Sequence, residues 1–408
     1  MELFPFRALR PPKSRVEDVA SPPYDVINTT EALGLAQGKP DSFLHVIRPE
    51  INFEDPNSAT GQSLHDEAGR QLKALASRGA LEQDEEPALW VYRLIMDGRA
   101  QVGMVGCADV DAYADGRIKK HEFTRPDKED DRTQHVDTVG AHTGPVFLAC
   151  RSTEGLQTLQ EELMGSEPEY DFEADDGIRH TLWRVGDAED LRKASTEYAA
   201  IDAFYIADGH HRAASAHRVR DLRVQRGAAE DQREFARFLV VVFPEDQLKI
   251  LAYNRVVKDL NGLTNEQFLA SLDRHFEVGP PGAEPSPPRA RSLCVYLGGD
   301  WRLLRTRSHV VDEDDPVGRL DAALLQNLVL APILGIENPR INQRIQFVGG
   351  IRGTDYLEKL AGEKGVAFSM FPTSIDELFA VADSGEVMPP KSTWFEPKLR
   401  SGLLVHPF

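Results

Sequence analysis

The sequence has few cysteines and no long apolar run. Its three cysteines, Cys107, Cys150 and Cys294, are far apart and form no CxxC pair, which excludes a disulfide framework and a cysteine-only zinc site. No stretch of 18 apolar residues could span a membrane, and the start of the chain, interrupted by Pro5, does not resemble a signal peptide. We therefore expect a reduced, cytoplasmic protein without a membrane partner.

Basic residues are also too few to balance the acidic ones. Lysine and arginine number 47 against 66 aspartates and glutamates, which gives a net charge of −19. This acidic excess disfavours nucleic acid as a partner, because a nucleic-acid surface needs a broad basic face. A small anion could still bind where the fold gathers a local cluster of basic side chains. We therefore expect a small-molecule partner.

The length of 408 residues predicts two or three domains. The clearest break is Gly279–Pro288, which reads GPPGAEPSPP and is typical of an exposed turn or linker. We predict an N-terminal α/β region over 1–160, a second region over 161–275 that shares one core with it, and a C-terminal α/β region over 289–408.

Strands and helices alternate loosely along the chain. Ala88–Met96 and Gln101–Val110 are predicted strands, and the Asp97-Gly98 pair between them predicts a hairpin turn. Phe238–Phe243 is a near-continuous apolar run that predicts a strand buried on both faces. Helices are predicted over the ranges Ser63–Arg78, Ala213–Gln225, Asp321–Leu334 and Ser374–Asp383. These elements predict a mixed α/β, or α+β, protein.

The most informative segment reads IADGHHRAAS, a predicted strand that runs through Asp208 and Gly209 into a predicted helix. Glycine lets the backbone turn tightly and approach a ligand, and the start of the helix offers N–H groups to an anion. Arg212 adds a planar donor fork, and His210 and His211 could donate to phosphate or relay protons. Asp208 could hold Mg²⁺. Alternatively, Asp208 only caps the helix and the histidines fill a polar core.

A second candidate segment is Lys119–Asp137, in which cations alternate with carboxylates. Its cations could hold phosphate while its carboxylates bind Mg²⁺ or abstract a proton. The candidate phosphate ligands here are Lys120, Arg125 and Arg132. The alternative is a salt-bridged surface loop. The turn-prone GAHTGP sequence that follows adds His142 and Thr143 as candidate substrate ligands.

Three other segments carry weaker candidates. Lys391 and Thr393 could reach a phosphate, although the glycines of a P-loop are missing and Trp394 and Phe395 also fit a packed C-terminal strand. The rigid SPPYDV turn could place Asp25 in a pocket, or be only a turn. Candidate contacts to a substrate carboxylate or phosphate, with salt bridging as the alternative, are Asn254 and Arg255.

Known catalytic signatures of other classes are missing. There is no HExxH zinc motif, no GxSxG nucleophile turn and no GxGxxG dinucleotide loop. A metal-only enzyme, a serine hydrolase and a dinucleotide-dependent enzyme are therefore set aside.

The DGHHR run resembles the phosphate-binding element of free-serine kinases built on the ParB/sulfiredoxin-like fold. Gly209, His211 and Arg212 match that element residue by residue. Over almost the whole chain the sequence also resembles the bacterial and archaeal family DUF1015. The matching stretches are Phe6–Pro12, Ala20–Val26, Lys120–Arg132, Ile206–Arg212, Tyr253–Lys258 and Met388–Gly402.

These resemblances imply a ParB/sulfiredoxin-like core with additional α/β elaborations. The kinase resemblance implies phosphoryl transfer on free L-serine, or on O-phosphoserine in a phosphatase-like direction, with ATP or ADP and Mg²⁺. Such a kinase is expected to use a glutamate as base toward the serine hydroxyl, for which Glu122 is the candidate and Asp208 the substitute. His210 would assist proton transfer, and Asp208 would be the metal ligand.

The alternative from another class is a nucleotide-binding regulatory or sensor protein of the ParB-like type, which binds nucleotide without converting a metabolite. The sequence does not distinguish the two, and it leaves open whether the protein is a homodimer.

Overall fold

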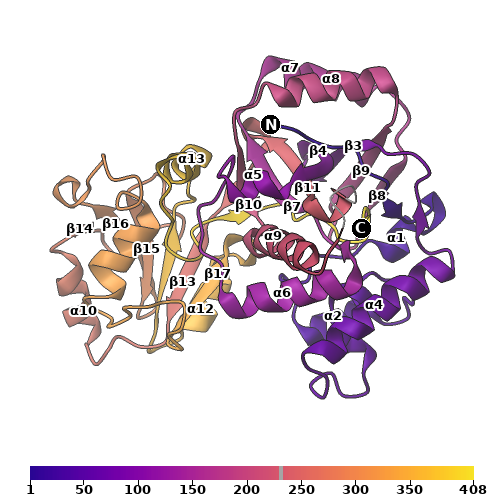
Figure 1. Ribbon diagram of the computed structural model, residues 1–408. Coiled ribbons are helices and arrows are strands. Elements are labelled where there is room, and N and C mark those ends of the chain that lie inside the picture. The colour runs from indigo at the N-terminus through magenta and orange to yellow at the C-terminus, as the bar shows by residue number, and fades with distance from the viewer. Residues whose placement is uncertain (229–232) are drawn as a thin grey trace. The chain divides into compact units, whose positions relative to one another are not determined.

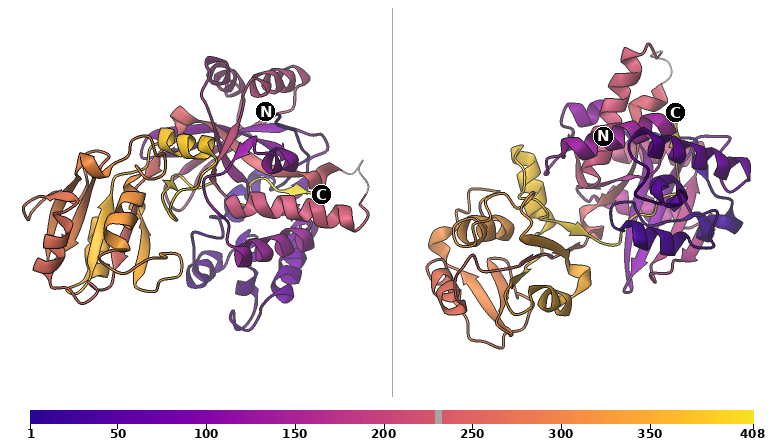
Figure 2. Two further views of the ribbon diagram at one scale, coloured as in Figure 1. Left: turned by 60° about the vertical axis from the view of Figure 1, so that its left-hand side comes forward. Right: turned by 90° about the horizontal axis from the view of Figure 1, so that it is seen from below.

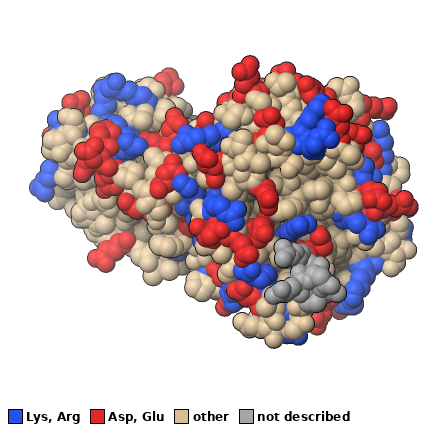
Figure 3. All heavy atoms as spheres, turned by 45° about the horizontal axis from the view of Figure 1, so that its top comes forward, with Lys and Arg blue, Asp and Glu red and all other residues tan. Residues whose placement is uncertain are grey.

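The structure is a computed structural model that describes residues 1–228 and 233–408 (Figure 1). It confirms a mixed α+β protein with several sheets. Within the described ranges, no helix is both long and apolar enough to cross a membrane. On the face drawn in Figure 3, basic and acidic side chains are interspersed.

The chain forms two compact units. The first comprises Met1–Leu248 together with Pro397–Phe408, and the second comprises Lys249–Glu396. The second unit is therefore inserted into the first, and the chain returns to the first unit for its last residues. The GPPGAEPSPP break lies inside the second unit, between the strands β14 (Phe276–Val278) and β15 (Ser292–Leu297).

The first unit is built on an eight-stranded mixed sheet. Its strands, in spatial order, are β5 (Ile118–Lys119), β10 (Phe204–Asp208), β7 (Val146–Cys150), β11 (Arg237–Pro244), β4 (Arg99–Asp109), β3 (Leu89–Met96), β9 (Arg179–Val185) and β8 (Tyr170–Glu173). β3 and β4 form the predicted hairpin, in which Asp97 and Gly98 both have positive φ angles of 52° and 76°. β11 is buried along its apolar run, as predicted.

Strands β5 and β10 stand at one end of this strand order. They are parallel neighbours, with Phe204 opposite Ile118 and Tyr205 opposite Lys119. Their carboxyl ends therefore meet at the same edge of the sheet. Two sequence segments that lie far apart, one after Lys119 and one after Asp208, thus leave the sheet side by side.

Helices surround this sheet. The longer ones are α2 (Thr29–Ala36), α4 (Gln62–Ser77), α6 (Pro126–Val139), α7 (Glu154–Leu163), α8 (Ala188–Ala199) and α9 (His210–Gln225). α6 lies beside α9, and α7 lies beside α8 (Figures 1 and 2). The short helices are α1 (Val16–Val19), α3 (Leu44–Ile47) and α5 (Val110–Ala114). The helices predicted from apolar spacing in the first unit, α4 and α9, are confirmed.

The second unit has its own six-stranded sheet and core. The strand order is β14, β16 (Asp300–Thr306), β15, β18 (Val366–Met370), β13 (Tyr253–Val257) and β17 (Ile345–Gly349). Its helices are α10 (Asn265–Leu272), α11 (Asp321–Leu325), α12 (Thr354–Ala361) and α13 (Ile375–Ser384). α13 begins within the helix predicted over Ser374–Asp383, and a capping box between Ser374 and Glu377 starts it. α11 passes into a π-helical turn before Pro332, which cannot continue a helix because it lacks an N–H.

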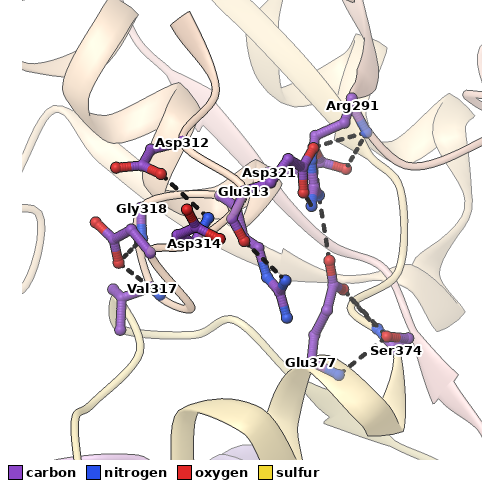
Figure 4. A network of polar contacts seen from close by, with 11 residues as sticks. Arg291, Asp312, Glu313, Asp314, Val317, Gly318, Asp321, Ser374 and Glu377 are labelled. Atoms are coloured by element: carbon purple, nitrogen blue, oxygen red, sulfur yellow. Dashed lines mark hydrogen bonds and ion pairs between the residues drawn. The ribbon is translucent and has the colours of Figure 1, made fainter. Parts of the chain in front are cut away.

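A polar network ties α13 to the start of α11 (Figure 4). The backbone N–H of Arg291 donates to both carboxylate oxygens of Asp321, at 2.9 and 3.1 Å, and the Arg291 guanidinium donates to Glu377 at 3.1 Å. Burial raises the pKa of Asp321 to about 7, although the positive charge of Arg291 acts in the opposite direction. The acidic run before α11 forms a loop, in which Asp312 and Asp315 accept bonds from nearby backbone N–H groups.

Buried histidines give the first unit a predictable response to acid. Burial lowers the pKa of His121 to about 4 and, together with Arg400, that of His180 to about 3. Both groups bind more protons in the unfolded chain, so the stability they support is present at neutral pH and is lost as pH falls below 6.5. Between about pH 7.5 and pH 5 we expect a loss of about 2 kcal/mol from each histidine.

Urea unfolding at the two pH values checks this expectation. Asp321 acts in the opposite direction in the second unit, because its raised pKa favours the folded state at low pH. The fluorescence that follows unfolding must therefore report on the first unit alone. Trp90 and Trp183 provide it in a variant in which Trp301 and Trp394 are replaced by phenylalanine. An unfolding midpoint that does not change between the two pH values contradicts the prediction.

Candidate functional site

The site begins where β10 passes into α9. Gly209 joins the two elements with a φ of +96°, a left-handed conformation that glycine adopts without strain. A Cβ atom at this position would lie 2.8 Å from Nε of Arg212. Glycine thus allows both the turn and the close approach of the arginine side chain. α9 has 16 residues, so its first turn directs several N–H groups and the positive end of the helix dipole to this point.

Arg212 is the centre of an ion-pair cluster. Its guanidinium lies 3.1 Å from Asp208 and 3.5 Å from Asp25, and Nζ of Lys398 lies 3.9 Å from the other oxygen of Asp208. The Arg212 side chain is 15% exposed. Burial by itself would lower the pKa of Arg212, but the carboxylates of Asp25 and Asp208 raise it above the usual value. The arginine therefore remains charged, and part of it faces solvent.

The segment that follows β5 meets α9 through two histidines. The backbone N–H of His121 points to Nε2 of His210 at 3.5 Å, and the two rings make an edge-to-face contact with centroids 4.5 Å apart. Burial holds the pKa of both histidines well below the usual range. Both rings are therefore neutral at pH 7, and His210 could move a proton only as a neutral imidazole.

A small cavity lies beside Arg212. It has a volume of about 30 Å³, which is room for a group the size of one water molecule. Its lining residues come from six separated stretches of the chain: Tyr24, Ile47, Arg132, His135, Val136, His142, Thr143, Gly144, Arg212 and Ser401. Ser21 and Ser401 exchange two backbone hydrogen bonds and so join the SPPYDV segment to the C-terminal segment.

The cavity wall is rich in nitrogen. Arg132 lies 4.4 Å above the ring of Tyr24 and 2.6 Å from Asp131. Within residues 1–228 and 233–408, hydrogen-bond partners are missing for both ring nitrogens of His135, for Nε2 of His142 and for Nε of Arg212. Buried polar atoms without partners are costly, and they often mark the place of a ligand or an ordered water.

Other predicted residues of the first unit have local roles. Nζ of Lys120 lies 4.0 Å from the ring centroid of Tyr113, and Arg125 pairs with Asp127 at 2.8 Å beside the start of α6. The Arg125–Asp127 pair fits the alternative predicted for this segment, a salt-bridged surface loop. Glu122 is half-buried in the segment between β5 and α6, and His211 is half-buried in the first turn of α9.

Four predicted ligands belong to the second unit. Asn254 accepts a hydrogen bond from the N–H of Met370 at 2.9 Å, and Arg255 is buried with its guanidinium donating to the carbonyl of Lys391 at 3.1 Å. Nζ of Lys391 lies 5.6 Å from the ring centroid of Tyr253. Thr393 is half-buried just before β19 (Trp394–Phe395). These contacts all lie inside that unit.

The described part of the chain holds no group of three or more histidine, cysteine, aspartate or glutamate side chains arranged to bind a metal ion. Asp208 and Asp25 both face Arg212. Proteins commonly coordinate the Mg²⁺ of a bound nucleotide through one or two carboxylates of this kind. This donor set fits a metal that is bound jointly with phosphate.

His135 and Lys398 belong to two of the segments singled out in the sequence, Lys119–Asp137 and Met388–Gly402, and both lie at the site. A helical spacing of three between Arg132 and His135 places both on one face of α6, and this spacing could have identified the histidine. Lys398 lies in a sequence motif far from Asp208, and nothing in the local sequence indicates that the two would pair.

Gly209→Ala is expected to weaken both the fold and the site. A side chain at φ +96° is strained, and its Cβ would displace the Arg212 guanidinium. We expect a loss of about 1–2 kcal/mol in the free energy of unfolding, measured by urea titration. Affinity for ADP should fall about tenfold, measured by calorimetry.

Gly177→Ala is the matched control. Gly177 has a φ of +75° in the turn before β9, and an added Cβ would meet no described atom within 4 Å. It should destabilise the protein to a similar extent and leave ADP affinity unchanged. If both variants lose ADP affinity equally, the effect of Gly209 is one of stability alone.

The fold and the site together define a mixed α+β protein in which a helix begins at a glycine and two arginines line one cavity. This arrangement is suited to a small anion. A family model described as a protein of unknown function, DUF1015, matches residues 3–323. The chain therefore belongs to the DUF1015 family.

Several solved structures match at low similarity. A free serine kinase in complex with AMP is 17% identical, with 71% of this chain and 86% of that chain covered and a TM-score of 0.36. C-terminally truncated SbnI from Staphylococcus aureus is 14% identical, with 74% and 86% covered and a TM-score of 0.38. A conserved hypothetical protein from Pyrococcus furiosus is 15% identical, with 71% and 90% covered and a TM-score of 0.33. No curated protein matches.

Proposed function

We propose that this protein transfers a phosphoryl group between an adenine nucleotide and a small hydroxy amino acid, with free L-serine or O-phosphoserine as the expected substrate. One observation carries the proposal: separated motifs converge beside Arg212, at a helix start that suits an anion. The resemblance of DGHHR to the phosphate element of free-serine kinases points to the same chemistry.

The nucleotide phosphates would sit at Gly209 and the first N–H groups of α9. Arg212 would donate to the phosphate oxygens, and Lys398 and Arg132 would add positive charge nearby. In phosphoryl transfer most of the catalysis comes from positioning and from charge stabilisation of the transferred group, so a fixed arginine at this point is the main requirement. His211 would remain a further phosphate ligand in the same helical turn.

Three carboxylates are candidates for the proton acceptor. Glu122 is the one implied by the kinase resemblance. Asp208 is held by both Arg212 and Lys398, which makes its oxygens less available for a proton. Asp25 lies 3.5 Å from the arginine that would hold the phosphate and is 39% exposed, so a substrate hydroxyl bound there could reach it. We assign the role to Asp25.

Mg²⁺ would be held by Asp208 together with the nucleotide phosphates. When bound, it would neutralise phosphate charge. The protein side chains bind and orient the substrate, and Asp25 takes the hydroxyl proton at its carboxylate.

The remaining expectations are part of this proposal. The first unit would contain the ParB/sulfiredoxin-like core, and the protein would act in the cytoplasm, either alone or as a homodimer. His142 and Thr143 would contact substrate. Lys120 and Arg125 would contribute at most long-range charge, since each has a local partner. Asn254, Arg255, Lys391 and Thr393 remain predicted ligands within the second unit.

The test is an assay of the purified full chain. It is incubated with L-serine and either ATP or ADP, and separately with O-phosphoserine with and without ADP, each with Mg²⁺. Phosphorus NMR identifies the products. Turnover in any of these mixtures supports the proposal, and no turnover in all of them rejects it.

The second candidate function is a nucleotide sensor that converts no metabolite. The small volume of the cavity, about 30 Å³, favours it, because a whole metabolite does not fit without rearrangement. A sensor would bind ADP through Arg212, show no turnover for Asp25→Asn to lower, and lose no measured property in Glu122→Gln. Loss of turnover in either variant rules the sensor out.

A further inference from the structure

His135 is a buried polar side chain without a local role. It lies on α6, is 1% exposed and lines the small cavity beside Arg212. No residue of the described chain offers a hydrogen-bond partner to either of its ring nitrogens. Its neighbour His65 makes an edge-to-face contact with it, with ring centroids 6.0 Å apart, but does not line the cavity.

The protonation state of His135 decides what it can bind. Burial, together with the charge of Arg132 and the ring of His65, holds its pKa well below the usual range. The ring is therefore neutral at pH 7, with one nitrogen as donor and the other as acceptor. The acceptor nitrogen needs a ligand hydrogen, which a fully ionised oxyanion such as sulfate does not have.

The other groups on the wall have the opposite character. Arg132 and Arg212 are donors only, and they suit carboxylate or phosphate oxygens. A ligand that satisfies the whole wall thus carries anionic oxygens together with a hydroxyl or amino hydrogen. The cavity has about 30 Å³, which accepts one such group and is too small for a phosphate.

We infer that His135 is a substrate-binding residue that accepts a hydrogen bond from the hydroxyl or amino group of a hydroxy amino acid, while the arginines hold its anionic oxygens. This inference rests on the site of the proposed function and adds a residue and a chemical requirement to it. A ligand that offers only anionic oxygens, such as sulfate at neutral pH, can pair only with the donor nitrogen of His135 and therefore gains less from this residue.

Calorimetry on the full chain tests this with two probes, O-phospho-L-serine and sulfate. His135→Phe should weaken O-phosphoserine binding by about tenfold or more and sulfate binding clearly less, by about threefold at most. His135→Gln, which keeps a donor and an acceptor, should recover most of the loss. His65→Phe is the matched control, because it alters the same buried pair outside the cavity, and it should change neither affinity.

A urea titration of each variant separates an effect on folding from an effect on binding. A variant that loses affinity at an unchanged unfolding midpoint has lost a binding contact. If His135→Phe does not fold, the unmodified protein labelled with ¹⁵N-histidine is used, and the resonance of the acceptor nitrogen of His135 should shift with O-phosphoserine and clearly less with sulfate. Equal losses of affinity for both probes in His135→Phe, or an equal effect of His65→Phe, would overturn the inference. So would a His135 ring resonance that does not shift. If O-phosphoserine does not bind at all, the cavity holds water only and the inference is wrong.

These outcomes are distinct from those of the turnover assay. A protein that binds O-phosphoserine through His135 but transfers no phosphate refutes the proposed reaction and keeps the inference. A protein that turns over serine equally well with His135→Phe, at unchanged KM, keeps the reaction and refutes the inference.

Discussion

Arg212→Ala is expected to lower kcat/KM for phosphoryl transfer by about a thousandfold and to weaken ADP binding by about tenfold or more. The arginine is the cation nearest the Gly209 turn, and it remains charged because Asp25 and Asp208 flank it. Its loss leaves the helix start as the main phosphate ligand. Steady-state kinetics and calorimetry with ADP measure the two effects.

Arg218→Ala provides the matched control on the same helix. Arg218 is 40% exposed and pairs with Glu129 and Asp130 on α6, at 3.2 and 2.6 Å. Removing it takes one positive charge from α9 without touching the site, so ADP affinity and turnover should stay within about twofold of wild type. Equal effects of the two substitutions would mean that only overall charge matters.

Asp25→Asn is expected to lower kcat by about a hundredfold or more, because the asparagine amide cannot take the substrate proton. ADP should bind as tightly as to wild type or more tightly, since Arg212 loses one carboxylate that competes with phosphate. A fall in kcat without a rise in nucleotide KM therefore identifies the proton acceptor. A loss of both would indicate that Asp25 only orients Arg212.

Glu122→Gln and Asp208→Asn complete this comparison. Glu122→Gln should lower kcat by less than about tenfold. Asp208→Asn should change both kcat and ADP affinity, because Asp208 holds Arg212 and Lys398. If Glu122→Gln has the largest effect on kcat, the base is the glutamate that the kinase resemblance implies, and our assignment of Asp25 is wrong.

Local features of the fold were predictable because they depend on short-range chemistry. The Asp97-Gly98 hairpin follows from two residues that tolerate positive φ, and the start of α9 follows from glycine after an apolar strand. The Ser374/Glu377 capping box is likewise a property of four consecutive residues. In each case the residues that determine the element are neighbours in the chain.

The assembly of the site depends on long-range pairing and could not be predicted in this way. The parallel pairing of β5 with β10 brings His121 to His210, and the Ser21–Ser401 bonds bring two distant motifs together. The insertion of the second unit between Leu248 and Pro397 has no local sequence signal.

Charge illustrates the same limit. If the fold gathers its basic residues in one place, the sequence predicts one cationic pocket on an otherwise negative surface. Arg212 and Arg132 do line one cavity, but each stands beside a carboxylate, from Asp208 and Asp131 respectively. The site is therefore a set of ion pairs that an incoming anion must reorganise, and counting charges in the sequence does not show this.

A crystal structure of the full chain grown with ADP, Mg²⁺ and L-serine tests the central claim most directly. The account predicts phosphate density against the N–H groups of the first turn of α9, within hydrogen-bond distance of Arg212, and the serine hydroxyl near Asp25. Nucleotide bound elsewhere, with Gly209–Arg212 unchanged from the present structure, would contradict it.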